Sequence, residues 1–594
     1  MSQSQDLELG IIGNGGVSAL VDRRGRIVWG CLPTFDGDPV FCSLLTPTIG
    51  EAGLFDVLLD GLADQTQHYL DNSAVLRTRL SSADGSAVEI TDFAPRYKQH
   101  GRLFHPMTLV RTLRPVAGAP RIRVRLRPLA GYGARRPERT LGSNHVRFLL
   151  DGLVLRATSD MPLPMLADEL PFLLDRPVHI VLGPDETLAE SPARFAHEAQ
   201  EATLGYWHEW VRYLSIPAEW QEAVIRAAIT LKLCQYEGTG AIVAAMTTSI
   251  PEAAHTVRNW DYRYCWLRDA AFVVRALNRL GATRSMEEYL RYLFNLAAGQ
   301  GDLAPVYGIH FERELHEREA EHLAGYRGMG PVRIGNDAWR QTQHDVHGSV
   351  VLAATQLFFD RRLVAAGDAA AFRRLEPAGE AAWRLYDQPD AGLWEFRGRA
   401  SVHTYSSVTC WAGCDRLARI AGHLGLADRA GHWRARADAM RMKILERAVH
   451  PQRGHFVDVF DGSGLDASLL LLAELGFVGA TDPRYVATVE AIGAALARGH
   501  HLFRYIAADD FGMPETGFTI CSFWYVDALA AIGRREEARA LFEKLLSQRN
   551  ALGLLSEDIA PATGELWGNF PQTYSLVGLV NAAMRLSRSW EELS

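Results

Sequence analysis

The connections between predicted helices constrain the fold of this chain more than any other feature of its sequence. From about residue 217 onward, apolar residues recur at the i, i+3, i+4 spacing of amphipathic or buried helices, and Gly or Pro residues mark their ends. Links after even-numbered helices are a few residues long, whereas links after odd-numbered helices are long. Twelve helices are predicted: 217–237, 268–280, 284–299, 343–365, 371–387, 405–423, 426–448, 466–476, 483–498, 517–532, 534–549 and 572–588.

Helices that alternate in direction place all of their long links at the same end. We therefore expect an all-α (α/α)6 barrel with a loop-built pocket at one end and tight turns at the other. A helical repeat solenoid would also alternate short and long links, but its period would be shorter and more regular than the one found here. The six long links are 238–267, 300–342, 388–404, 449–465, 499–516 and 550–571.

The first two hundred residues follow a different pattern, in which short β-rich runs are separated by turn residues. Runs that begin at Val17, Val75 and His145 are each followed by a Gly-containing turn and a second run, which predicts hairpins. Several hairpins in series indicate an antiparallel β-sandwich. Because helical spacing starts near residue 193, we expect three parts: a β-sandwich domain over 1–192, a helical linker over 193–216 and the helical barrel over 217–594.

Composition and charge exclude several classes of partner. The net charge of −8 provides no basic surface for nucleic acid or an anionic membrane, and the apolar runs are too short to span a bilayer. The first residues lack the basic and apolar regions of a secretion signal, so we expect a cytoplasmic protein with a neutral substrate. Metal-binding and phosphate-binding motifs are also missing, which predicts no metal and no cofactor.

One stretch, residues 258–270, combines four aromatic residues, three arginines and two aspartates. Adjacent Arg268 and Asp269 present a donor fork and an acceptor for hydroxyl groups, while Trp260 and Trp266 offer flat apolar faces to a sugar ring. The alternative to sugar binding is that this stretch is a loop leading into a helix, with an internal ion pair. Asp269 falls at the start of a predicted helix, where we expect the helix dipole to keep it ionised with a low pKa.

Two glutamates occupy long loops on opposite sides of the predicted barrel. Glu395 follows the fifth helix and Glu557 follows the eleventh, half a turn of the barrel away. Inverting glycoside hydrolysis needs two carboxyl groups roughly 6.5–9.5 Å apart, one as acid and one as base. A single loop glutamate is usually a solvated surface charge. The predicted catalytic role therefore depends on the two glutamates occurring together in opposed loops. Asp558 and Glu565 are alternative bases, and Glu565 ranks second to Glu557.

The combined motifs resemble those of glycoside hydrolase family 15, the group of glucoamylases, glucodextranases and bacterial trehalases. The run Trp-x-x-Arg-x-x-Trp-Leu-Arg-Asp-Ala matches the family signature, and the resemblance extends from Leu7 to Leu586. The segment Leu393-Trp394-Glu395 resembles the one that holds the family's general acid. Ser556-Glu557, followed after a short gap by Thr563-Gly564-Glu565, resembles the one that holds its general base. The resemblance implies these roles: Glu395 as acid, Glu557 as base, Arg268 and Asp269 on the terminal glucose, and Arg504 with Tyr505 on the second sugar; Trp260, Trp266 and Trp394 bind substrate.

Other positions relate less directly to this resemblance. Asp36 and Asp38 lie in a loop that resembles one near the mouth of the family's catalytic site, so we expect them at its rim. The chain departs from the family pattern at His347, where Tyr is usual, and at residues 309–311, which replace an Asp-Gly turn. Both departures are expected to affect the choice of substrate.

Family resemblance implies an exo-acting, inverting α-glucosidase of the glucoamylase type that removes terminal glucose from α-glucans or oligosaccharides. A trehalase is the nearest alternative, because bacterial trehalases share the same motifs and N-terminal domain. A disaccharide phosphorylase is more remote, since phosphate would replace water and a base at Glu557 would be unnecessary. A non-catalytic sugar-binding module or helical scaffold would not need both opposed carboxylates.

Overall fold

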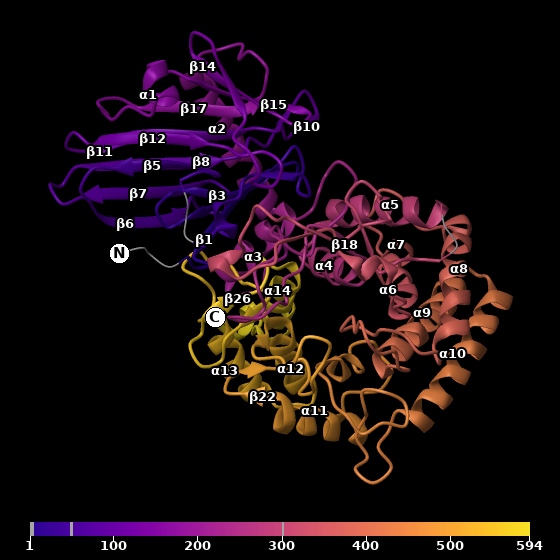
Figure 1. Ribbon diagram of the computed structural model, residues 1–594. Coiled ribbons are helices and arrows are strands. Elements are labelled where there is room, and N and C mark those ends of the chain that lie inside the picture. The colour runs from indigo at the N-terminus through magenta and orange to yellow at the C-terminus, as the bar shows by residue number, and fades with distance from the viewer. Residues whose placement is uncertain (1–4, 48–50, 300–301, 594) are drawn as a thin grey trace.

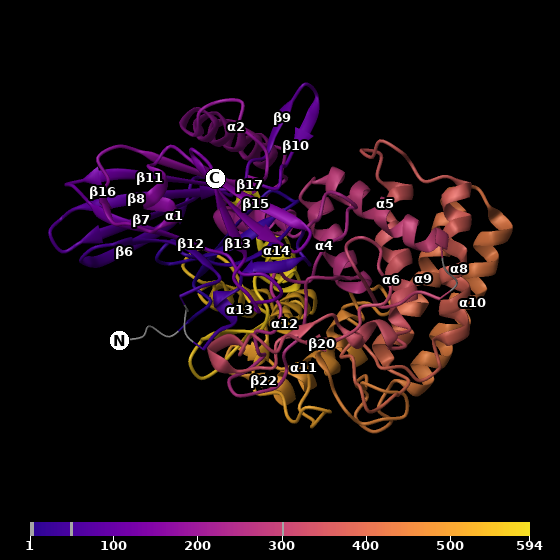
Figure 2. The same cartoon turned by 45° about the horizontal axis from the view of Figure 1, so that its top comes forward.

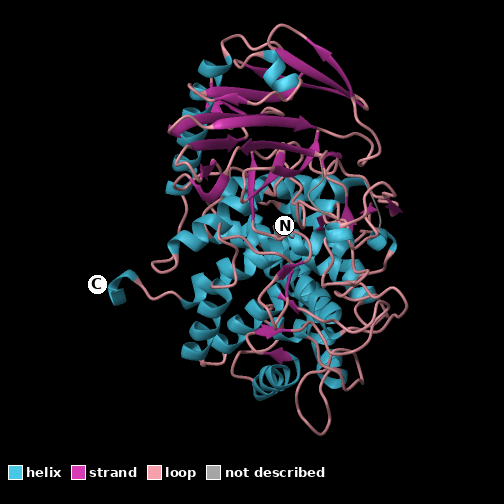
Figure 3. Ribbon diagram, turned by 60° about the vertical axis from the view of Figure 1, so that its left-hand side comes forward, coloured by secondary structure: helices cyan, strands magenta, loops and turns pink. Residues whose placement is uncertain are grey.

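The structure, a computed structural model, describes residues 5–47, 51–299 and 302–593 (Figure 1). Figure 3 shows that strands gather in one part of the molecule and helices in the other. The prediction that the N-terminus carries no secretion signal includes the first four residues, which lie outside the described residues. None of the described helices is both long and apolar enough to span a bilayer.

The N-terminal part contains two antiparallel sheets that share a hydrophobic core. Val57 and Val124 from the first sheet pack in the same cluster as Leu80, Ile90 and Leu113 from the second. The first sheet contains β1 (Leu9–Gly13), β2 (Ser18–Asp22), β3 (Ile27–Leu32), β4 (Asp38–Phe41), β5 (Leu54–Leu59), β12 (Arg121–Arg127) and β16 (Phe172–Leu173). The second contains β6 (Leu62–Tyr69), β7 (Leu76–Ser82), β8 (Ala87–Phe93), β11 (Leu109–Ala117), β13 (Glu138–Leu141), β14 (His145–Leu150), β15 (Leu153–Ser159) and β17 (Val178–Pro184).

The three predicted hairpins are confirmed as β2–β3, β7–β8 and β14–β15. Their turns explain why these residues form hairpins. In the first turn, Asp22 Oδ1 accepts the backbone N–H groups of Arg24 and Arg26, and Gly25 takes a φ of +72°. Side chains of Asp and the left-handed backbone of Gly suit such tight turns.

Helix α2 (Pro192–Arg212) follows the second sheet and packs against it (Figure 2). Ser191 caps the helix by accepting the backbone N–H of Arg194 at 3.3 Å. Ala196 and Ala199 then pack with Val110 and Val181 from the sheet. The segment predicted as a helical linker is therefore a helix that covers the strands.

The predicted helices all correspond to helical segments of the structure, with two differences. The predicted helix 343–365 is broken at Thr355, and 466–476 contains only a 3-10 helix. Residues 467–472 are buried without an exposed face, so their apolar run does not distinguish a helix from other buried backbone. The segments are α3 (Gln221–Leu233), α4 (Leu267–Arg279), α5 (Thr283–Gly299), α6 (Asp345–Ala354), α7 (Gln356–Phe359), α8 (Ala369–Leu385), α9 (Thr404–His423), α10 (Ala427–Arg447), η4 (Ala467–Leu471), α11 (Pro483–Leu496), α12 (Thr519–Ala531), α13 (Arg535–Leu546) and α14 (Thr573–Leu586).

These segments form a closed ring, which Figure 1 shows below and to the right of the strands. The inner segments contact one another in the order α4, α6, α9, η4, α12 and α14, and α14 returns to α4. The outer helices α3, α5, α8, α10, α11 and α13 each pack against inner segments. Short elements complete the described chain: η1 (Ser43–Leu45), β9 (Tyr97–Gln99), β10 (Arg102–Phe104), α1 (Leu163–Ala167), β18 (Cys265–Trp266), β19 (Val306–Tyr307), β20 (Arg318–Glu319), η2 (Tyr326–Gly328), β21 (Arg333–Ile334), η3 (Asp337–Arg340), β22 (Ala497–Arg498), β23 (His501–Leu502), β24 (Gly517–Phe518), β25 (Asp558–Ile559), β26 (Leu566–Trp567) and α15 (Trp590–Leu593).

The strand-rich part contacts the loop that precedes α4. Trp29 of β3 donates its indole N–H to the carbonyl of Met246 at 2.7 Å. Arg263 is fully buried, pairs with Asp261 at 2.7 Å, and donates to the carbonyl of Gly37 at 2.9 Å. The residues on either side of Arg263 are therefore fixed partly by the N-terminal part of the chain.

Candidate active site

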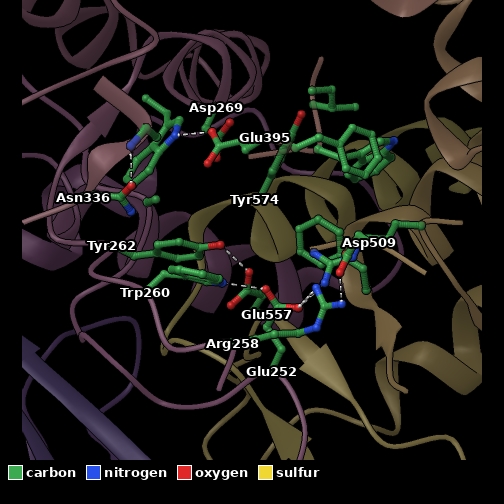
Figure 4. Close-up of a pocket in the computed structure, with 18 of the residues that line it drawn as sticks. Glu252, Arg258, Trp260, Tyr262, Asp269, Asn336, Glu395, Asp509, Glu557 and Tyr574 are labelled. Carbon is green, nitrogen blue, oxygen red and sulfur yellow. Dashed lines mark hydrogen bonds and ion pairs between the residues drawn. The ribbon is translucent and has the colours of Figure 1, made fainter. Parts of the chain in front are cut away.

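A pocket of about 890 Å³ is lined by residues of five of the six predicted long loops, the fourth being the exception. Figure 4 shows the charged and aromatic side chains that meet there from segments far apart in the sequence. Functional loops on a rigid scaffold commonly converge in this way. The nine predicted site residues all line the pocket: Glu395, Glu557, Trp260, Trp266, Arg268, Asp269, Trp394, Arg504 and Tyr505.

Glu395 lies at the end of a tight turn that directs its side chain into the pocket. Its φ of 59° is left-handed, a conformation that costs a residue other than glycine roughly 1–2 kcal/mol. The turn is closed by its backbone N–H, which donates to the carbonyl of Gly392 at 3.1 Å. Trp266 donates its indole N–H to Glu395 Oε1 at 2.7 Å, and Gln343 donates to the same oxygen at 3.2 Å. The carboxyl group is 26% exposed, so it remains accessible from the pocket.

Glu557 is more deeply placed and has no solvent exposure. The hydroxyl of Tyr262 donates to its Oε1 at 2.6 Å, and the backbone N–H of Asn569 donates to Oε2 at 3.3 Å. Burial raises the pKa of Glu557 well above its usual range, and the nearby carboxylates of Glu252 and Asp558 raise it further. Once ionised, this carboxylate is a stronger base than a solvated glutamate.

Arg268 and Asp269 lie in the first turn of α4, on the floor of the pocket. Arg268 donates to Asp269 Oδ1 at 3.2 Å and to Gln343 Oε1 at 2.8 Å, which fixes the guanidinium. The expectation of a low pKa for Asp269 is wrong. Burial raises the pKa of Asp269 to about 6, although Arg268 acts in the opposite direction. Desolvation therefore outweighs the attraction of the neighbouring Arg268.

A buried ionic cluster beside Glu557 was not predicted. Glu252 accepts the indole N–H of Trp260 at 3.0 Å and is paired with Arg504. Arg258 lies 3.8 Å from Glu252 and pairs with Asp509 at 2.6 Å. Glu252 follows a proline in a loop without a family motif, so its sequence carries no signal. Arg258 belongs to the predicted stretch, but its partner is 251 residues away.

The alternative bases lie outside the pocket lining. Glu565 is paired at 2.7 Å with Arg327 and is partly exposed. Asp558 is buried and accepts the hydroxyl of Thr516 at 2.9 Å. Among the candidates for a base, Glu557 is thus the carboxylate that reaches the pocket.

Several residues expected near the substrate are not among the residues that line the pocket. Asp38 accepts the backbone N–H of Tyr132 at 2.8 Å, a contact between distant parts of the chain, whereas Asp36 accepts the hydroxyl of the nearby Thr34 at 2.8 Å. His347 is buried in α6, where burial lowers its pKa to about 4. Phe311 stacks on Tyr292 with ring centroids 4.9 Å apart. The departures from the family pattern therefore fall in supporting structure.

Within the described part of the chain, no group of three His, Cys, Asp or Glu side chains is arranged to hold a metal ion. The arrangement provides what hydrolysis of a glycoside requires: two carboxyl groups in one pocket, hydrogen-bonding groups for hydroxyls, and aromatic faces for sugar rings. This set of groups defines a glycoside hydrolase.

Comparison with known proteins identifies the family. Residues 219–584 match the model described as glycosyl hydrolases family 15, and residues 3–164 match a model described as trehalase-like, N-terminal. The chain belongs to glycosyl hydrolase family 15, and it is an O-glycoside hydrolase.

Relatives and solved structures agree with this assignment. The chain is 31% identical to a trehalase of Thermoplasma volcanium over 98% of its own length and 93% of the relative. It is 32% identical to a trehalase of Mycobacterium tuberculosis, with coverage of 97% and 88%. The structure of a bacterial glucoamylase complexed with acarbose superposes with a TM-score of 0.70, at 13% identity and coverage of 99% and 94%. At that identity the structural likeness concerns the fold.

Proposed function

We propose that this enzyme is a trehalase, which hydrolyses α,α-trehalose to two molecules of glucose with inversion at the attacked carbon. The observation that carries hydrolysis is that Glu395 and Glu557 line one pocket from two different loops. The choice of trehalose is supported by the full-length similarity to proteins named trehalase. This proposal reverses the order expected from the motifs, which placed a glucoamylase-type activity first.

In the proposed reaction, Glu395 donates a proton to the oxygen that bridges the two glucose units. Glu557 removes a proton from a water molecule, which attacks the anomeric carbon from the opposite face of the ring. Trp266 and Tyr262 hold the two carboxyl groups in place through the hydrogen bonds described above. The reaction consumes one water molecule and returns both carboxyl groups to their starting states after proton exchange with solvent.

The remaining residues bind the two sugars in this proposal. Arg268 and Asp269 bind hydroxyl groups of the first glucose, and Arg504 with Tyr505 contacts the second. The aromatic side chains of Trp260, Trp266 and Trp394 provide apolar faces. Proton transfer between two carboxyl groups and water requires no metal or organic cofactor in this mechanism.

The same geometry supports a second candidate, an exo-acting α-glucosidase of the glucoamylase type. The overall likeness to the bacterial glucoamylase concerns the fold, so it does not favour that substrate. A disaccharide phosphorylase is disfavoured because phosphate would take the place of water, and the buried base Glu557 would then have no role.

The finer architecture is part of the proposal. The closed order of contacts among the helices supports an (α/α)6 barrel, and the core shared by the two sheets supports a β-sandwich. We place the β-sandwich domain at 1–192, the linker at 193–216 and the catalytic domain at 217–594. Helix α2, which covers the strands, supports a close association of the linker with the first domain.

One experiment separates these activities. Purified enzyme is incubated in parallel with trehalose, maltose, maltotriose and isomaltose, with and without phosphate, and the products are followed by NMR. We expect glucose from trehalose at a rate independent of phosphate. Hydrolysis of maltotriose without hydrolysis of trehalose would support the glucoamylase type instead, and release of glucose 1-phosphate would identify a phosphorylase.

A further inference from the structure

A short surface segment contributes residues to the pocket lining. We call residues 506–513 the strap. Asp509 and Gly512 pair their backbones in a tight turn, with N···O distances of 3.0 and 3.3 Å, and Gly512 takes a φ of +98°. Most of the strap is exposed, whereas Asp509 and Phe511 are directed toward the pocket and line it.

The strap is fastened to the loop 238–267 by an ion pair and an aromatic contact. Asp509 pairs with Arg258 at 2.6 Å, and their side chains are only 5% and 6% exposed. The ring of Phe511 meets the ring of Trp260 edge to face, with centroids 5.0 Å apart. Both partners belong to the loop that also carries Tyr262.

The strap is also fastened to the loop 388–404, near the proposed acid. Asp510 accepts the backbone N–H of Arg397 at 2.7 Å, two residues beyond Glu395. The guanidinium of Arg397 also lies over the ring of Trp260, 4.6 Å from its centroid. The strap therefore bridges two loops that both line the pocket.

The inward side of the strap continues into the proposed second sugar site. Tyr505 immediately precedes the strap, and its hydroxyl donates to Asp509. Arg258 connects the strap to Glu252, which is paired with Arg504. A sugar held by Arg504 and Tyr505 would thus share the pocket with the ring of Phe511 and the Asp509–Arg258 pair.

We propose that the strap limits the substrate to two sugar units, with Phe511 and the Asp509–Arg258 pair blocking any extension beyond the second sugar. This inference rests on the proposed trehalase function. It explains how one member of a family that includes enzymes acting on long glucans can be confined to a disaccharide substrate. Specificity of this kind comes from a steric obstacle to the longer ligand rather than from tighter binding of the shorter one.

The test compares trehalose with a trisaccharide made from trehalose by adding one α-1,4-linked glucose to one ring. Its unmodified ring fits the first site, and hydrolysis with one water yields glucose and maltose. The variants are Phe511→Ala, which removes bulk, and Asp509→Asn, which weakens the ion pair. Met513→Ala is the matched control, because Met513 belongs to the strap but is 47% exposed.

For wild type we expect kcat/KM to be far lower for the trisaccharide than for trehalose. Phe511→Ala should raise the trisaccharide-to-trehalose ratio of kcat/KM by about tenfold or more, with a smaller rise for Asp509→Asn. Met513→Ala should leave the ratio unchanged. If one of these two variants fails to fold, the trisaccharide-to-trehalose ratio of kcat/KM measured for the other still tests the proposal.

The inference is overturned if wild type accepts the trisaccharide as well as trehalose, or if Phe511→Ala and Asp509→Asn keep the wild-type ratio. Failure of the proposed function gives a different result, namely no hydrolysis of trehalose by wild type. In that case maltose and maltoheptaose, assayed with the same variants, show whether the strap restricts chain length.

Discussion

The rings of Tyr262 and Trp266 meet edge to face, with centroids 5.3 Å apart and an interplanar angle of 66°. Each donates a hydrogen bond to one of the two pocket glutamates, Tyr262 to Glu557 and Trp266 to Glu395. One short stretch of chain thus sets the positions of both carboxyl groups. A displacement of either ring would change the separation on which the proposed inverting mechanism depends.

Replacing either pocket glutamate by glutamine should remove activity without unfolding the protein. We expect Glu395→Gln and Glu557→Gln each to lower kcat by about two to four orders of magnitude, because each removes a proton-transfer group and keeps its shape. Glu565→Gln is the matched control and should stay near wild type. An inactive Glu565→Gln beside an active Glu557→Gln would show that the base is misassigned.

Glu557→Gln should also make the folded protein more stable at neutral and alkaline pH. Burial raises the folded-state pKa of Glu557, so its contribution to stability is present below the unfolded pKa of about 4.3 and is lost as pH rises through the folded value. Glutamine carries no charge and avoids this loss. Calorimetry at pH 4 and pH 8 should show a gain in Tm that is larger at pH 8. A lower Tm than wild type at pH 8 would contradict the argument.

The acidic limb of the pH profile of kcat/KM should respond in opposite directions to two substitutions. Apart from burial, Glu252 raises the pKa of Glu557, whereas the hydrogen bond from Tyr262 lowers it. Glu252→Gln should therefore move the limb to lower pH, and Tyr262→Phe should move it to higher pH. Rates are measured from pH 4 to 9, with circular dichroism as a control for folding. Shifts of the same sign would exclude Glu557 as the group that titrates.

Substitution of the residues proposed to bind the first glucose should weaken transition-state binding. Asp269→Asn and Arg268→Lys are expected to lower kcat/KM by roughly two to four orders of magnitude, because buried groups built to bind hydroxyls are left unpaired. Wild type should hydrolyse trehalose analogues that lack the contacted hydroxyl much more slowly than trehalose. The variant should hydrolyse the analogues only slightly more slowly than it hydrolyses trehalose. If wild type hydrolyses 4-deoxy and 6-deoxy analogues as fast as trehalose, these two residues have a structural role.

Stereochemistry provides an independent check of the proposed mechanism. Inversion at the attacked carbon turns one ring of α,α-trehalose into β-glucose, while the departing ring remains α-glucose. NMR spectra recorded before mutarotation should therefore contain the two anomers in equal amounts. Two molecules of α-glucose would indicate a covalent intermediate and a different role for Glu557.

Much of the fold was predictable because short links force consecutive helices to be neighbours. The alternation of links gave the order of the helical segments around the ring, and η4 was mistaken for a longer helix because its residues are buried on every side. Most of the pocket was also predictable, since Trp260, Trp266, Arg268 and Asp269 are close together in sequence.

The rest of the site depends on contacts between distant loops. Glu252 is paired with Arg504, and Arg258 is paired with Asp509. In each case the partner lies about 250 residues away in the sequence. Arg263 belongs to the predicted sugar-binding stretch, yet it is buried against the strand-rich part and does not line the pocket. Local sequence shows that such residues are charged but does not show which partner satisfies the charge.

The burial of Arg263 has a consequence for how this enzyme can be altered by recombination. Its guanidinium reaches Gly37 and the hydroxyl of Tyr132, while its chain neighbour Tyr262 holds Glu557. Arg263 would keep its ion pair with Asp261 in a helical part joined to a foreign N-terminal part, but its buried N–H groups would lose the acceptors Gly37 and Tyr132 next to the residue that positions Glu557. Chimeras between relatives should therefore retain activity only when the loops around Gly37 and Tyr132 come from the same parent as the 258–270 stretch.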